Sequence, residues 1–370
     1  MNEESKSYLN EQLITYIGNK RHLLKEIEKH LILVCKKLKK DKIVFADLFS
    51  GSGVVSRLAK KFSSKLICND LEDYSYAINS CYLSNFDEFS EDKFTYYLNN
   101  INNEINNNPI LDGIISTNYS PKDENNILKD ERVFYTKENA IYIDSFRYYI
   151  DKIVPSDYQK YFIAPLLSEA SIHVNTCGIF KGFYKDKKTG IGKFGGHKEN
   201  DLSRIKGKIL INKPVFSNYI CEYEIHKEDA NTLCKKLKNL DLVYLDPPYN
   251  QHPYSSNYFM LNVILKNNLD CNISKVSGIP DNWNRSIYNK KESALKGLKD
   301  IIKNTQSKFF LISYNNEGFI AFNEMLSMLK EFGTVISSAI KYYAFKGSRN
   351  LKKRKKHTKE YLFLLEKINN

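Results

Sequence analysis

Short apolar runs that each precede an amphipathic stretch are the feature of this chain that most limits its fold. Four runs are apolar and β-branched enough for buried parallel strands: residues 43–49, 65–70, 242–248 and 308–314. The amphipathic stretches after them are residues 54–62, 72–84, 258–266 and 317–331. Two last runs, 335–345 and 360–367, are typical of a closing antiparallel pair. Strands that alternate with helices predict an α/β protein with a doubly wound sheet, in which ligands bind beyond the carboxyl ends of the strands.

The alternation fades in the middle of the chain. Residues 98–109 are rich in Asn and predict a loop or a loosely packed helix, whereas residues 134–172 have the apolar spacing of helices. Residues 178–208 are rich in Gly, basic residues and aromatic residues. The simplest layout is one α/β domain that is split in sequence by a mainly helical insertion. The predicted boundaries are residues 1–85 and 229–370 for the two parts of the domain and residues 86–228 for the insertion.

Charge and cysteine content narrow the class of protein. Lys and Arg total 56 against 43 Asp and Glu, a net charge of +13 in 370 residues. This excess favours a polyanionic partner such as nucleic acid, although a Lys-rich proteome would produce it too. The seven cysteines show no C-x-x-C spacing, which argues against zinc sites and disulfides and for a reducing compartment. The polar N-terminus and the lack of an apolar run of about 20 residues predict a cytoplasmic protein with no membrane span and no metal.

A glycine turn follows the first predicted strand, and an acid ends the second. In DLFSGSG, Gly51 and Gly53 allow a tight turn beside a ligand, but the third glycine of a dinucleotide-binding fingerprint is missing. A turn without a ligand explains this motif alone equally well. Asp70 stands where an acid can accept hydrogen bonds from both hydroxyls of a ribose. Together the turn and the acid predict a nucleoside ligand.

Upstream of these motifs, residues 16–24 read YIGNKRHLL. Gly18 and Asn19 predict a turn before an amphipathic helix at residues 21–38. Backbone amides at a helix N-terminus, with Lys20 beside them, form a site for a carboxylate or a phosphate. A capped surface helix with a solvated Lys20 is the simpler interpretation of this segment alone.

The stretch DLVYLDPPYN, residues 241–250, leads an apolar run directly into an acid, two prolines and an aromatic ring. Prolines end a β-ladder and fix the backbone. The Asp246 carboxylate and the Pro247 carbonyl can accept two N–H bonds, and the Tyr249 ring offers a flat face. A planar heterocycle with an exocyclic amino group satisfies all three groups.

These motifs, in this order, resemble the class α, Dam-like DNA adenine methyltransferases over nearly the whole chain. The resemblance rests on YIGNK (residues 16–20), DLFSGSG (residues 47–53), Asp70 and DPPY (residues 246–249). Asn19 stands where the family commonly has Gly. Residues 168–186 also look like members that modify short asymmetric sites beside type IIS restriction enzymes.

The resemblance implies a Rossmann-like methyltransferase sheet, S-adenosylmethionine as cofactor, and duplex DNA as substrate. It also implies that the protein is the modification half of a restriction-modification system, in which a cognate restriction endonuclease can be its partner. The residues implied for the cofactor are Tyr16, Gly18, Lys20, Asp47, Phe49, Gly51, Gly53, Asp70, Asp229 and Asp246.

The residues implied for catalysis are Asp246, Pro247, Pro248 and Tyr249. The amino group of a flipped-out adenine would donate to Asp246 and to the Pro247 carbonyl, which would draw its nitrogen toward tetrahedral geometry and free its lone pair for in-line attack. Tyr249 would stack on the flipped base.

Two basic segments are predicted to hold the DNA. Residues 178–208 are the candidate target-recognition segment and carry several aromatic residues among the basic ones. Residues 341–359 hold nine Lys and Arg and no acid. The residues predicted to contact DNA are Lys181, Lys193, Arg204, Lys352, Lys353, Arg354 and Lys355.

Other activities stay open on the sequence alone. An RNA adenine methyltransferase would keep the same pocket beside a different insertion. An amino-methylating DNA cytosine methyltransferase commonly has Ser first in the tetrapeptide, and a methyltransferase of protein side-chain amides has Asn. A catalytically inactive DNA-binding module would not need Asp246, Pro247 and Tyr249, all of which are present.

Overall fold

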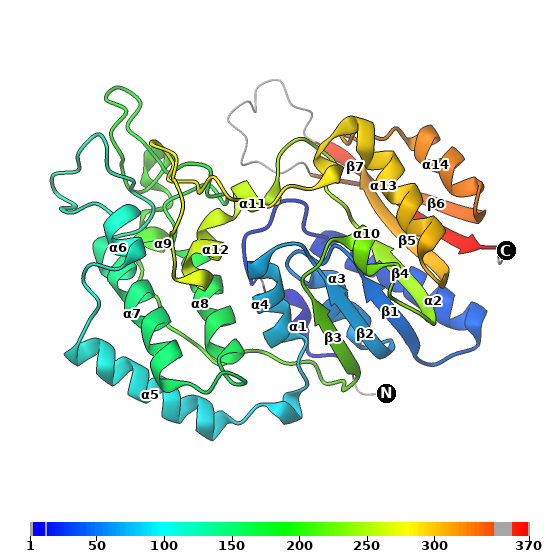
Figure 1. The fold of residues 1–370 in the computed structure, drawn as a ribbon, viewed down its shortest axis with the longest axis horizontal. Coiled ribbons are helices and arrows are strands. Elements are labelled where there is room, and N and C mark those ends of the chain that lie inside the picture. Colours follow the sequence, from blue (N-terminus) through cyan, green and yellow to red (C-terminus); the bar gives the residue numbers. More distant parts are fainter. Residues whose placement is uncertain (1–2, 12, 344–356, 369–370) are drawn as a thin grey trace.

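The computed structural model describes residues 3–11, 13–343 and 357–368. Its α/β part is built on a seven-stranded sheet with the order β3-β2-β1-β4-β5-β7-β6 (Figure 1). The strands are β1 (Ile43–Asp47), β2 (Ser63–Asn69), β3 (Glu222–His226), β4 (Leu240–Leu245), β5 (Ser307–Asn315), β6 (Gly333–Tyr343) and β7 (His357–Lys367). Strands β1 to β5 are parallel to one another, whereas β7 runs antiparallel to both β5 and β6. The predicted α/β fold and its closing antiparallel pair are confirmed.

Helices cover both faces of the sheet. The α-helices are α1 (Lys6–Asn10), α2 (Leu24–Leu38), α3 (Val54–Lys60), α4 (Asp73–Tyr82), α5 (Glu91–Asn107), α6 (Ile114–Asn118), α7 (Lys137–Ile153), α8 (Lys160–Ile172), α9 (Leu202–Lys206), α10 (Ala230–Leu233), α11 (Tyr254–Asn257), α12 (Phe259–Lys266), α13 (Lys291–Asn304) and α14 (Phe322–Lys330). Apolar side chains of α2 and α3 pack on one face, and those of α10, α13 and α14 pack on the other. Within the described ranges, no helix is both long and apolar enough to cross a bilayer.

The strand order reverses beside β1, which lies between β2 and β4. From β1 the sheet extends to β2 and β3 on one side and to β4 and β5 on the other. In such a sheet the crevice for a ligand opens where the order reverses, at the carboxyl ends of the strands. The glycine turn after β1, Asp70 after β2 and Asp246 after β4 all stand at this edge.

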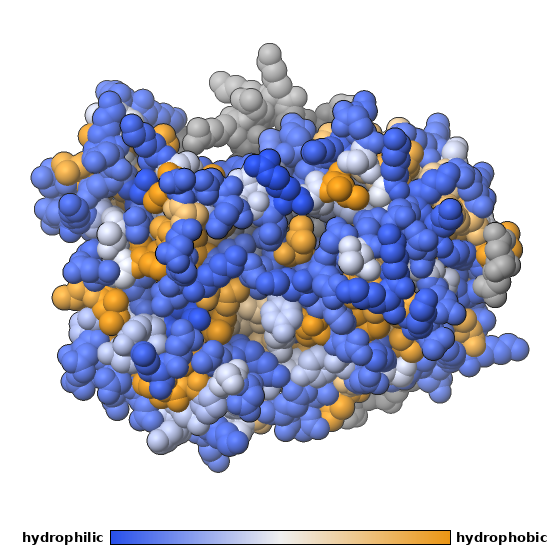
Figure 2. Space-filling model, in the orientation of Figure 1, coloured by the Kyte–Doolittle hydropathy of each residue, from blue (hydrophilic) through white to orange (hydrophobic). Residues whose placement is uncertain are grey.

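A second, helical body carries its own core, on the left of Figure 1. This core combines side chains of α4, α5, α7, α8 and α12 and is rich in aromatic residues, such as Phe94 stacked on Phe162 with ring centroids 4.7 Å apart. Because α4 follows β2 and α12 follows the DPPY segment, these two helices tie the helical body to the sheet. Figure 2 shows a face of the molecule that is mainly hydrophilic, with hydrophobic residues in scattered patches.

One of two alternatives for the Asn-rich stretch is confirmed, and two further elements were not expected from the sequence. Most of the Asn-rich stretch belongs to the helix α5, which Ser90 caps by accepting from Lys93 N and which buries Phe94 and Ile101. The edge strand β3 and the helix α13 were not predicted. β3 (EYEIH) is polar along its exposed edge and lacks the continuous apolar run of a central strand.

The division into residues 1–85, 86–228 and 229–370 stays a prediction. Two observations bear on its borders. β3 lies within residues 86–228 and pairs with β2 in the sheet. α12 lies within residues 229–370 and packs in the helical core.

Candidate active site

The glycine turn after β1 forms one wall of a cavity. Gly51 and Gly53 have positive φ angles of 52° and 73°, which side chains rarely adopt. A Cβ atom on Gly51 would stand 2.7 Å from the Tyr16 ring, and one on Gly53 would overlap the Asn79 amide. The turn therefore needs glycine at both positions, because the chain passes close to its neighbours there.

Asp47 fixes the start of this turn. Its Oδ1 accepts a hydrogen bond from Phe49 N at 3.3 Å, and its Oδ2 accepts one from Ser56 Oγ at 2.7 Å. Burial raises the pKa of Asp47 to about 7, although both hydrogen bonds act in the opposite direction. Asp47 therefore holds the local backbone while it also lines the cavity.

Asp70 connects the end of β2 to the glycine turn. Its Oδ2 accepts from Gly51 N at 2.7 Å, and its Oδ1 accepts from Glu72 N at 3.0 Å. Burial raises the pKa of Asp70 above its ordinary value against these bonds. The carboxylate thus belongs to the cavity wall and to the scaffold behind it.

The segment from Tyr16 to Lys20 is clamped by helices that follow the DPPY segment. Tyr258 Oη accepts from Ile17 N at 2.7 Å, and Tyr254 Oη donates to Ile17 O at 3.1 Å. The Tyr16 ring stacks on both tyrosines, with centroids 5.1 Å from Tyr254 and 4.9 Å from Tyr258. Two segments far apart in the sequence are therefore fixed against each other at the cavity.

Lys20, which is buried, and Asp246, which is partly exposed, form an ion pair. Lys20 Nζ lies 2.8 Å from Asp246 Oδ2 and 3.3 Å from Glu360 Oε1, and it donates to Gly18 O at 2.8 Å. Burial alone would lower the pKa of Lys20, but the two carboxylates outweigh it and raise the pKa well above its ordinary value. Burial raises the pKa of Asp246, Lys20 opposes the rise and Glu360 adds to it. The predicted solvated Lys20 is wrong, since the side chain is only 5% exposed.

The rest of the DPPY segment passes along the rim. Pro247 is buried, while Pro248 and Tyr249 are half-buried. The Tyr249 carbonyl accepts from Phe319 N at 3.0 Å, and its ring meets the Tyr314 ring edge to face with centroids 6.4 Å apart. The loop after β5 therefore supports the tetrapeptide from one side.

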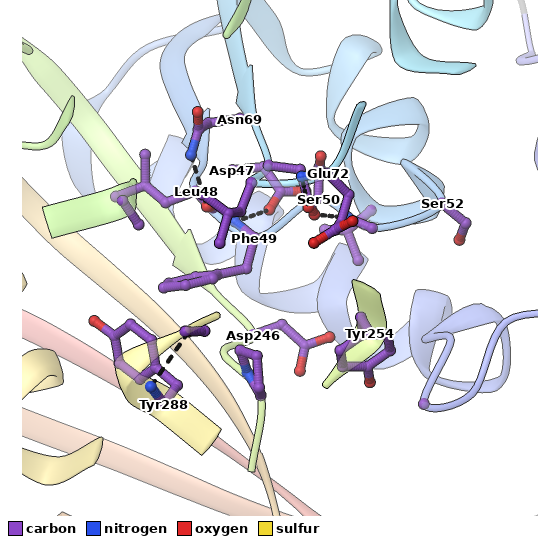
Figure 3. Close-up of a pocket in the computed structure, with 18 of the residues that line it drawn as sticks. Asp47, Leu48, Phe49, Ser50, Ser52, Asn69, Glu72, Asp246, Tyr254 and Tyr288 are labelled. Atoms are coloured by element: carbon purple, nitrogen blue, oxygen red, sulfur yellow. Dashed lines mark hydrogen bonds between the residues drawn. The ribbon is translucent and has the colours of Figure 1, made fainter. Parts of the chain in front are cut away.

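These groups surround one cavity, shown in Figure 3, with about 840 Å³ of space that is free of protein atoms and partly open to solvent. The predicted residues that line it are Tyr16, Gly18, Lys20, Asp47, Phe49, Gly51, Asp70, Asp229, Asp246 and Pro248. The predicted residues that do not line the cavity are Gly53, Pro247 and Tyr249, each of which is next in the chain to a lining residue. Asp229 also caps α10 by accepting from Thr232 N at 3.0 Å.

Several lining residues were missed by the sequence analysis. One of them, Tyr288, meets the predicted Phe49 edge to face, with centroids 5.0 Å apart, and the two rings form an apolar end of the cavity. Glu72 is buried beside Asp70, and burial raises its pKa to about 7. Its position two residues after Asp70 was the sequence signal by which Glu72 could have been predicted. No sequence signal marks Tyr288, because the loop before α13 brings it in from elsewhere in the chain.

Three of the predicted DNA-binding residues lie in the described part of the chain. Lys181 is half-buried. Burial lowers the pKa of His252, just after the DPPY segment, and the charge of Lys181 lowers it further. Lys193 pairs with Glu199 at 3.0 Å. The Arg204 guanidinium donates to the carbonyls of Ile172, Val174 and Thr176 and so holds the chain after α8. Lys352, Lys353, Arg354 and Lys355 lie outside the described residues.

Most of the aromatic residues of the candidate target-recognition segment are buried. Phe180, Phe183 and Phe194 are at most 7% exposed and belong to the helical core. Tyr184 donates to Asp201 Oδ2 at 2.7 Å. Three of the four rings therefore fold the segment onto the helical body and do not face solvent, because a Gly-rich segment needs buried side chains to hold it in place.

Comparison with known proteins identifies the family of the chain. Residues 16–328 match the D12 class N6 adenine-specific DNA methyltransferase family. The chain is 27% identical to the type II methyltransferase M.NlaIII of Neisseria lactamica over 361 residues, which is 96% of this chain and 99% of that protein.

Two larger relatives show a further likeness. The chain is 31% identical to modification methylase StsI of Streptococcus sanguinis and 27% identical to type II methyltransferase M.FokI of Planomicrobium okeanokoites, each over 367 residues. These matches cover 95% of this chain but 52% of each relative, so the chain spans about half their length. Since the family match extends over most of the sequence and includes the glycine turn and the DPPY segment, the chain belongs to the D12 class N6 adenine-specific DNA methyltransferases.

Proposed function

We propose that this chain transfers a methyl group from S-adenosylmethionine to the exocyclic amino group of adenine in duplex DNA, with Asp246 and the Pro247 carbonyl as the two acceptors for that amino group. The observation that carries the proposal is the position of Asp246. Its carboxylate borders the same cavity as Asp70 and Lys20, although the three residues follow or precede different elements. One cavity thus combines an acceptor for the target with acceptors and donors for a cofactor.

The residues of the cavity fit S-adenosylmethionine. Phe49 and Tyr288 supply an apolar end for an adenine ring, and Asp70 supplies acceptors for ribose hydroxyls. Gly18 and Lys20 stand at the other end, where they would receive the methionine portion. When bound, the cofactor supplies an electrophilic methyl group on a positively charged sulfur.

The chain's own groups would prepare the nucleophile. The amino nitrogen of adenine is a weak nucleophile because its lone pair is delocalised into the ring. Asp246 and the Pro247 carbonyl would accept its two N–H bonds and draw the nitrogen toward tetrahedral geometry. The two prolines hold one acceptor beside the other, because their fixed φ angles limit the backbone there. Positioning and electrostatics, with no covalent enzyme intermediate, account for the rate.

The target adenine must leave the duplex to reach this cavity. The Tyr249 ring at the rim is the surface on which the flipped base would stack, at a typical contribution of about 1–3 kcal/mol per base. Lys181 would contact a phosphate near the same opening, which gives a salt-dependent part of the affinity. Lys193, Arg204 and the basic residues 352–355 are further candidates for phosphate contact.

The cellular role that we propose is protection of DNA in a restriction-modification system in the cytoplasm, beside a cognate restriction endonuclease. The printed names of the relatives support it, because they include type II methyltransferases and modification methylases. Methylation-sensitive sequencing of DNA from cells that express the protein would reveal modified adenines at one short recognition sequence. Unmodified genomic DNA would contradict this role.

The substrate class is tested by incubating the protein with tritiated S-adenosylmethionine and, separately, with duplex DNA, RNA and protein. We expect label in duplex DNA alone. Label in RNA or protein, with DNA unlabelled, would overturn the proposed substrate.

A further inference from the structure

The ammonium group of Lys20 is shared by two carboxylates, that of Asp246, which borders the cavity, and that of Glu360, which is buried. Lys20 Nζ lies 2.8 Å from Asp246 Oδ2, at the end of β4, and 3.3 Å from Glu360 Oε1, on β7. The side chain of Glu360 is 1% exposed. Within the described residues, one ammonium group therefore faces two acids, an arrangement that differs from a simple ion pair.

Glu360 is itself held by β5. Ser313 Oγ donates to Glu360 Oε1 at 2.7 Å, and Asn315 Nδ2 donates to Glu360 Oε2 at 3.1 Å. Thr358 Oγ1 in turn donates to Asn315 Oδ1 at 3.2 Å. The carboxylate is therefore fixed toward Lys20 by hydrogen bonds across the antiparallel pair of β5 and β7.

We propose that Glu360 is a positioning residue for methyl transfer: it shares the Lys20 ammonium with Asp246 and so leaves Asp246 able to accept the amino group of the target adenine. The inference rests on the proposed role of Asp246. The neutral amino group of adenine is a weaker hydrogen-bond donor than an ammonium group. A Lys20 that paired with Asp246 alone would therefore compete with the substrate for this carboxylate. Glu360 reduces that competition because it attracts the same ammonium from the other side.

Because charged groups surround Asp246, the pH dependence of the methyl-transfer rate tests this arrangement. The titratable groups that face it or lie near it are Lys20, Asp47, Asp70, Tyr244, Tyr249, Tyr254 and Glu360. Burial raises the pKa of each tyrosine, so all three stay neutral under assay conditions. Among these groups, Lys20 and Glu360 carry the charges that act directly on the pKa of Asp246, and they act in opposite directions.

The experiment compares wild-type protein with Glu360→Gln, which removes one negative charge and keeps the size of the side chain. Single-turnover rates of methyl transfer to duplex DNA are measured across pH, so that product release does not hide the chemical step. We expect the plateau rate to fall about 10- to 100-fold, as for other small misplacements of reacting groups. We also expect the acid limb of the pH–rate profile to move to lower pH, because the pKa of Asp246 falls when a neighbouring negative charge is removed. Affinities for DNA and cofactor should change less than threefold.

Asp241→Asn is the matched control, because Asp241 is also a partly buried acid of the sheet that pairs with a lysine, Lys40, at 2.7 Å, but it stands at the opposite end of β4. We expect its acid limb to stay in place. An unmoved limb in Glu360→Gln, or an equal movement in both variants, would overturn the inference.

A second variant keeps the inference testable if Glu360→Gln does not fold. Ser313→Ala removes a hydrogen bond to Glu360 and leaves every charge in place, so we expect a smaller fall in the single-turnover rate. A Ser313→Ala rate equal to that of wild type would then contradict the positioning role. An inactive wild-type protein would instead refute the proposed function itself.

Discussion

Lys20 and Asp246, which stand far apart in the sequence, form an ion pair of 2.8 Å between Nζ and Oδ2 inside the cavity. The pair connects the turn before α2 to the end of β4, and it brings the motif nearest the N-terminus to the DPPY segment. An ion pair in this place is weak evidence of stabilisation, because the desolvation of two charges offsets much of their attraction. Its position at the carboxyl ends of the strands points instead to the reaction.

Asp246→Ala should reduce methyl transfer by at least about 100-fold, because the variant loses one of the two acceptors for the target amino group. Binding of S-adenosylmethionine, measured by calorimetry, should be retained at least in part, since Asp70, Phe49 and Tyr288 are unchanged. Asp241→Ala, at the other end of the same strand, is the control and should keep its activity per folded molecule. Undiminished turnover of Asp246→Ala would refute the mechanism.

The rate of methyl transfer should fall in acid at a higher pH than the ordinary aspartate pKa of about 3.8 predicts. The mechanism needs Asp246 as a carboxylate, and burial raises its pKa, so protonation begins at a higher pH than for an exposed aspartate. The activity is present above this raised pKa and is lost as the pH falls through it. Single-turnover rates, with circular dichroism to confirm that the protein stays folded, provide the measurement. A rate that stays constant down to the ordinary aspartate pKa would contradict the assigned role.

Tyr258→Phe should weaken cofactor binding more than it weakens DNA binding. The substitution removes the acceptor of the Ile17 N–H at the start of the Gly18–Lys20 turn and leaves that donor without its partner, at a cost of about 1–3 kcal/mol. Tyr161→Phe is the control, because the buried hydroxyl of Tyr161 has no hydrogen-bond partner in the described part of the chain. Calorimetric titration with S-adenosylmethionine compares the two variants. Equal affinities would show that the hydrogen bond between Ile17 N and Tyr258 Oη does not shape the cofactor site.

Lys181→Ala should lower DNA affinity and reduce the slope of log affinity against log salt by about 1, as expected for the loss of one phosphate contact. Lys187→Ala is the comparison, because Lys187 is exposed and belongs to the same predicted recognition segment. Fluorescence anisotropy with a labelled duplex at several salt concentrations measures both slopes. The same slope for Lys181→Ala and wild type would show that Lys181 does not contact a phosphate of the DNA.

The α/β class and the central strands were predictable because each central strand has a buried, continuous apolar run that ends in a turn or an acid, whereas the order of the strands came from the structure. β1 and β4 are examples: both are almost wholly buried, and each leads directly to a motif. β3 was not predictable by the same rule, since an edge strand of the sequence EYEIH does not have to bury both faces. The Asn-rich part of α5 was uncertain for a related reason, because the helix depends on Phe94 and Ile101 packing in the helical core and not on local propensity.

The candidate site was predictable where its residues belong to contiguous motifs. Asp246, Asp70 and the glycine turn each occur at a strand end, so the fold brings them together. Glu360 was hidden within an apolar strand, and its contact with Lys20 depends on the antiparallel return of β7 beside β5. The burial of Phe180, Phe183 and Phe194 could not be predicted from the sequence, because aromatic side chains occur both in cores and at nucleic-acid surfaces.

The most direct test is nucleoside analysis of duplex DNA after reaction with labelled S-adenosylmethionine, for wild-type protein and Asp246→Ala side by side. The account predicts label in N6-methyladenine with wild-type protein and none above background with the variant. Label in methylated cytosine, or equal labelling of adenine by both proteins, would contradict it.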